Sequence, residues 1–119
     1  MRYQIYPGID RERLVSLIPS RLQSRIPEWL PEDEVYTLIL VRSSIEVARS
    51  AILSRALEEL GDAPGRLVAA ANEFTKDALE MLNARGALVV AAGDFYWTDD
   101  SYEEVRVLIG AKVKKPQHR

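Results

Sequence analysis

Two short segments, Tyr36–Val41 and Ala87–Ala92, are apolar at nearly every position. A strand with one face in water alternates between apolar and polar residues, whereas a strand covered on both faces does not. The pattern therefore predicts two strands inside a sheet, with Tyr36–Val41 at a central position. A chain of 119 residues is long enough to bury the core that such a sheet requires.

The stretch Arg66–Arg85 has the pattern of one long amphipathic helix. Asp62 can cap it, Pro64 suits its first turn, and Gly86 suits its carboxyl end. Phe74 lies in the middle of the apolar side and is predicted to be a core residue. The apolar positions follow helical spacing, and they are Leu67, Ala70, Ala71, Phe74, Ala78, Met81 and Leu82.

The other elements are predicted from local signals. A strand at Arg2–Tyr6 precedes a helix that Asp10 caps and Pro19 interrupts. A second helix, Ser44–Leu60, ends at Gly61, and its broad apolar surface suits burial inside the monomer or at a subunit interface.

The carboxyl-terminal part is predicted to form a β-hairpin. Residues 93–97 continue the strand before them, Thr98–Ser101 forms a turn, and Tyr102–Val113 returns. The element order predicts one α+β domain over residues 1–113, with a mixed sheet of about four strands and helices packed mainly on one face. Residues 114–119 are predicted to be a flexible basic tail, and the strand order does not follow from the sequence.

Several classes of function have no support in the composition. There is no cysteine, and the only histidine, His118, lies in the tail, so thiolate chemistry and histidine-dependent triads are excluded. No glycine-rich phosphate loop or serine elbow is present. We therefore predict no catalytic residue, no metal site and no cofactor. The longest apolar runs are shorter than the roughly 18 residues of a membrane span, and a cytoplasmic protein without membrane contact is expected.

Aromatic residues gather around the hairpin turn and suggest recognition. Tyr, Trp and Arg are the residue types that most often anchor protein interfaces. The leading hypothesis is a non-enzymatic interaction or assembly module whose partner is another protein or a second copy. If Trp97 and Tyr102 flank the turn as a cross-strand pair, Phe95 and Trp97 share one face of the hairpin with Tyr102, Glu104 and Arg106. Trp29, in a proline-bounded loop, is either a plug over the core or an exposed anchor. The predicted interface residues are Phe95, Trp97, Tyr102, Arg106 and Trp29.

Three alternatives use charged residues. Asp94 and Glu104 could hold a divalent metal for hydrolysis. The run Arg42–Ser43–Ser44 precedes the predicted second helix and could bind an anion at its first turn. A nucleic-acid-binding module would use the basic tail together with Arg2, Arg11, Arg13, Arg21 and Arg25, although the acidic body would repel phosphates.

Overall fold

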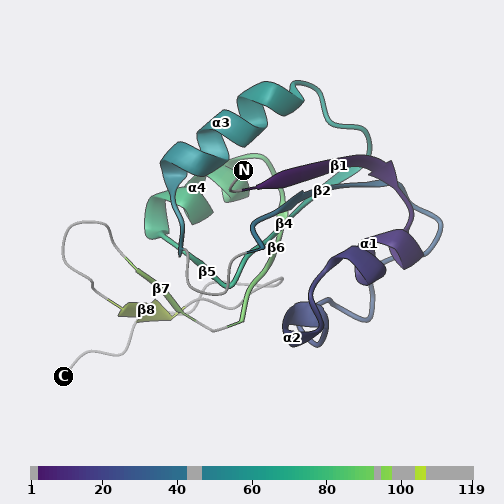
Figure 1. Cartoon of the computed structure of the whole chain (residues 1–119), viewed down its shortest axis with the longest axis horizontal. Coiled ribbons are helices and arrows are strands. Elements are labelled where there is room, and N and C mark those ends of the chain that lie inside the picture. The colour runs from purple at the N-terminus through teal and green to yellow at the C-terminus, as the bar shows by residue number, and fades with distance from the viewer. Residues whose placement is uncertain (1–2, 43–46, 93–94, 98–103, 107–119) are drawn as a thin grey trace.

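The computed structural model describes residues 3–42, 47–92, 95–97 and 104–106. Along the chain these residues form twelve elements (Figure 1). In order they are β1 (Gln4–Ile9), α1 (Arg11–Leu17), α2 (Ser20–Gln23), β2 (Tyr36–Leu40), β3 (Val47–Ala48), α3 (Ser50–Leu60), β4 (Arg66–Ala70), β5 (Glu73–Phe74), α4 (Lys76–Ala84), β6 (Leu88–Val90), β7 (Phe95–Trp97) and β8 (Glu104–Arg106).

The main sheet has four strands in the order β1-β2-β4-β6. Strand β1 is antiparallel to β2, and β2, β4 and β6 run parallel to one another. The predicted α+β class with a mixed sheet is therefore confirmed, and β2 has the central position that its apolar sequence indicated. Two small pairs accompany the sheet, parallel β3–β5 and antiparallel β7–β8.

Both faces of the main sheet are covered. Ile39, Leu67 and Ala69 face a core shared with α3 and α4, whereas the alternate residues Leu38 and Val68 face a core shared with α1 and α2. Figure 1 shows the two longer helices together on one side of the sheet and the two short helices on the other. The prediction that helices pack mainly on one face therefore holds for the longer helices α3 and α4, whereas the short helices α1 and α2 cover the other face.

The prediction of one helix over Arg66–Arg85 is wrong. Residues 66–70 form β4, residues 73–74 form β5, and helix α4 begins only at Lys76, with Thr75 as its cap in place of Asp62. The backbone of β4 pairs with β2 on one side and β6 on the other. These partners lie far away in the sequence, and their pairing outweighs the local helical preference of the alanines.

The other local predictions have mixed outcomes. Asp10 caps α1 by accepting a hydrogen bond from the Arg13 backbone N–H at 2.8 Å, as predicted. The second helix ends at Gly61 as predicted, but it begins at Ser50, because residues 47–48 form β3. Residues 43–46 lie outside the described residues.

The first turns of α3 and α4 are joined by Asp77. Its Oδ1 accepts hydrogen bonds from the Thr75 hydroxyl at 2.6 Å and from the Ala78 N–H at 3.1 Å. The hydroxyl of Ser50, at the start of α3, is the largest cause that lowers the pKa of Asp77, followed by Thr75. The carboxylate therefore stays ionised and neutralises the positive end of the α4 dipole.

Phe74 is buried, with 1% of its surface exposed, and packs in the core of α3 and α4. Its predicted role in the core is confirmed, although it lies on β5. We predict that Phe74→Ala lowers the free energy of unfolding by about 3 to 5 kcal/mol, because the lost ring leaves a cavity. Urea denaturation measures this, with Lys76→Ala at an exposed neighbouring position as the control. Equal effects of the two substitutions would contradict the assignment.

Candidate functional site

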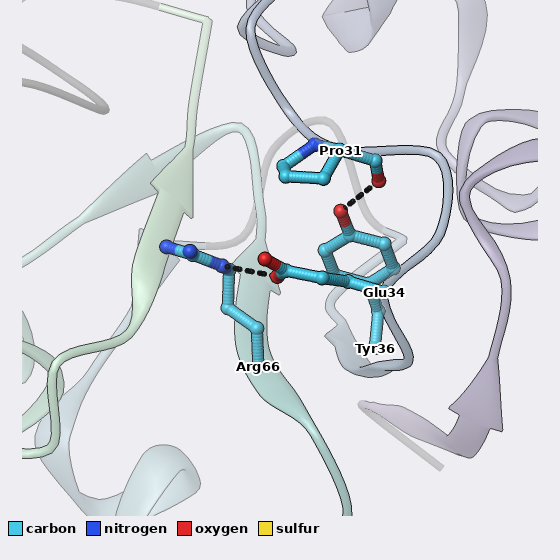
Figure 2. A network of polar contacts seen from close by, with 4 residues as sticks. All are labelled: Pro31, Glu34, Tyr36 and Arg66. Carbon is cyan, nitrogen blue, oxygen red and sulfur yellow. Dashed lines mark hydrogen bonds and ion pairs between the residues drawn. The ribbon is translucent and has the colours of Figure 1, made fainter.

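At the amino-terminal edge of the parallel strands, the loop that precedes β2 is bonded to the start of β4. Arg66, the first residue of β4, donates its backbone N–H to the Val35 carbonyl at 2.9 Å. Its side-chain Nε lies 3.3 Å from Glu34 Oε1 in an ion pair whose side chains are 37% and 41% exposed (Figure 2). Both contacts hold the segment before β2 against the start of β4.

Tyr36 fixes the same loop from the interior. Its side chain is fully buried, and its hydroxyl donates a hydrogen bond to the Pro31 carbonyl (Figure 2). Burial raises the pKa of Tyr36, and the nearby charge of Glu34 raises it further. The phenol therefore remains protonated and keeps its donor role at physiological pH.

Trp29 extends from this loop into solvent. Trp29 is 58% exposed and Val35 is 48% exposed, and they are the exposed large hydrophobic residues of the part of the chain that the structure describes. The guanidinium carbon of Arg66 lies 5.7 Å from the centroid of the Trp29 ring, within range of a cation–π contact. We call Trp29, Glu34, Val35 and Arg66 the Trp29 surface.

A groove of about 540 Å³ adjoins this surface. Apolar and charged side chains line it together, and the acids Glu34 and Asp62 balance the bases Arg66 and Arg85. The groove reaches the carboxyl ends of α3 and α4, and its main lining residues are Val35, Leu57, Leu60, Gly61, Arg66 and Arg85. Its chemistry suits an apolar side chain flanked by polar groups rather than a strongly charged ligand.

The predicted interface is divided between two ends of the molecule. Trp29 lies at the amino edge, where its ring contacts the Arg66 guanidinium. Strand β7, which holds Phe95 and Trp97, contacts β5 beyond the carboxyl edge (Figure 1). In the hairpin, Phe95 pairs with Arg106 and Trp97 with Glu104, so Trp97 does not pair with Tyr102. This register still groups Phe95 and Trp97 with Glu104 and Arg106, as the sequence predicted. Tyr102 itself lies outside the described residues.

The predicted anion site loses its original basis. The helix that was to follow Arg42–Ser43–Ser44 begins only at Ser50, and Ser43 and Ser44 lie outside the described residues. Arg42 instead donates its Nε to Gln4 Oε1 at 2.7 Å.

The alternative in which Asp94 and Glu104 hold a divalent metal remains untested. Asp94 lies outside the described residues. Within the described ranges, no three Asp, Glu or His side chains group in a way that could hold a metal ion.

Comparisons of the chain with protein-family models, with curated proteins and with solved structures found no match. Among the helices of the described residues, none has both the length and the apolar character needed to cross a membrane. The function must therefore be argued from the surface itself.

Sequence reasoning missed Arg66, Glu34 and Val35. Arg66 stands directly before a fully apolar run, which is a signal for a strand start, but helical spacing took precedence in the interpretation. Pro27 and Pro31, which bracket Trp29, were the available sign that its loop is held in place.

Gly65 permits the close approach of the loop and β4. Its φ is +72°, and a Cβ at this position would lie 2.0 Å from the Val35 carbonyl oxygen. We predict that Gly65→Ala destabilises the fold by about 2 kcal/mol or more, because backbone strain and a clash act together. Gly86→Ala is the matched control, since its φ of +69° is similar but a Cβ there meets nothing within 4 Å. Equal thermal melts for the two variants would show that the contact is unimportant.

Proposed function

We propose that this protein is a non-enzymatic assembly module that binds a second copy of itself through the Trp29 surface. The observation that carries the proposal is that Trp29 is 58% exposed while its ring makes a cation–π contact with Arg66. Leaving a large apolar ring in water is unfavourable, and a partner surface would remove it from solvent.

The Trp29 surface has the features of an interface hot spot. Tryptophan and arginine dominate the binding energy of many interfaces, especially at well-packed central positions. Tyr36 and Arg66 restrain the loop before any partner arrives, so binding would order few additional groups. A restrained surface loses less conformational entropy on association, which favours affinity.

The charges favour a second copy over an unrelated partner. A twofold interface brings the same patch of each subunit together, so the patch must complement itself. The Trp29 surface carries both members of an ion pair, Glu34 and Arg66. In a twofold arrangement, Glu34 of each copy can face Arg66 of the other, while the groove beside Val35 receives the opposing Trp29.

We predict that Trp29→Ala weakens dimer formation by about 2 kcal/mol or more while leaving the monomer folded, because the exposed ring contributes little to the core. Sedimentation equilibrium measures the association, and circular dichroism monitors the fold. Trp97→Ala is the comparison variant, because it tests the hairpin residues that the sequence favoured. If only Trp97→Ala loses association, the interface lies at the hairpin and not at the Trp29 surface. A native chain that is strictly monomeric would refute self-association.

Charge reversal tests whether the pair acts between copies. We predict that Glu34→Arg alone and Arg66→Glu alone are mainly monomeric, because each carries like charges across the twofold axis. An equimolar mixture should form heterodimers, since every facing pair then has opposite charges. Light scattering of the mixture against the separate variants decides this. A mixture that remains monomeric while both variants are folded would contradict the twofold arrangement.

A further inference from the structure

Arginines from the α2 region reach the carboxyl ends of all three parallel strands. Arg21 Nη2 donates to the carbonyl of Arg42, which follows β2, at 2.9 Å. Arg21 Nε donates to Oδ1 of Asn72, which follows β4, at 3.4 Å. Arg25 Nη2 donates to the carbonyl of Ala92, which follows β6, at 2.9 Å. Positive charge from a separate layer is thereby placed along this edge of the sheet.

Arg42 is fixed at the same edge by β1. Its Nε donates to Gln4 Oε1 at 2.7 Å, and its Nη2 lies 3.5 Å from the Tyr6 hydroxyl. The Tyr6 hydroxyl in turn donates to Gln4 Oε1 at 2.7 Å, so a hydrogen bond joins the two groups that accept from Arg42. The guanidinium is therefore held in position although Arg42 is exposed to solvent.

The partners of Arg21 and Arg42 within the described ranges are all neutral. They are a backbone carbonyl, two side-chain amide oxygens and a phenolic hydroxyl. Neutral acceptors orient a guanidinium without cancelling its charge. Arg66 at the opposite edge differs, because it pairs with the carboxylate of Glu34.

A guanidinium that is oriented but not neutralised suits a phosphate. Its planar set of N–H donors matches two phosphate oxygens at once. Among the described residues, the bonds above occupy only part of the five N–H donors of each guanidinium. We propose that Arg21 and Arg42 together bind a phosphate group at the carboxyl edge of the sheet. This site is separate from the Trp29 surface, and neither depends on the other.

The group could belong to a small phosphate ligand or to a nucleic-acid backbone, since both present the same oxygens. Inorganic phosphate is the first probe, followed by a 5′-mononucleotide and a single-stranded oligonucleotide. Phosphate contacts to a polymer give a steep salt dependence, which separates the backbone from a small ligand.

The test follows the arginine Nε–H signals of the full chain by NMR. We expect the signals of Arg21 and Arg42 to shift saturably with inorganic phosphate but not with chloride at equal ionic strength. Arg21→Lys and Arg42→Lys should each weaken binding about tenfold, because lysine keeps the charge but loses the planar donor pair. Arg13→Lys, at an exposed position on α1, is the matched control and should change nothing.

Two results would overturn the proposal. One is a shift that chloride reproduces or that never saturates, because this indicates general screening. The other is phosphate or oligonucleotide binding that Arg21→Lys and Arg42→Lys leave unchanged while both variants retain the native circular dichroism spectrum. Tighter binding of the mononucleotide or the oligonucleotide, lost in the same two variants, would support the site and identify the source of the phosphate.

Discussion

Burial of both faces of β2 and β4 is the constraint on which the rest of the structure depends. Every residue of β2 is buried, and in β4 only Arg66 is partly exposed. Strands without a wet face need a layer on each side, and here α3 and α4 supply one while α1 and α2 supply the other. With the faces closed, the two ends of the parallel strands are where side chains from several elements meet water, and both candidate sites lie there.

The sequence predicted the parts of the fold that local chemistry determines. The nearly all-apolar run Tyr36–Val41, the Asp10 cap and the Gly61 stop are local signals that need no distant partner, and all are confirmed. The run Leu67–Ala71 differs, because small apolar residues at every position satisfy a helical stripe and a doubly buried strand equally well. Pairing with β2 and β6 decides between them, and neither partner is local in sequence.

The same limit explains how much of the site was predictable. Trp29 was predicted as an interface residue from its residue type, which is a local signal. Its neighbours were not, because Glu34 and Arg66 are 32 positions apart and meet only when β4 is placed beside β2. Arg21 and Arg42 were considered separately, one for nucleic acid and one for a helix start. Their meeting depends on α2 crossing the strand ends, which no spacing in the sequence encodes.

The direction of the helices gives the two edges different electrostatic character. Because β2, β4 and β6 are parallel, α3 and α4 both run back across the sheet, with their amino ends at the carboxyl edge. Their negative ends therefore lie by the groove, where Arg66 and Arg85 offset them. At the carboxyl edge, the Asp77 carboxylate lies at the first turns of both α3 and α4 and offsets the positive ends of both helices. The positive charge of the proposed phosphate site therefore comes from Arg21 and Arg42, whose neutral hydrogen-bond partners do not cancel it, and not from a helix dipole.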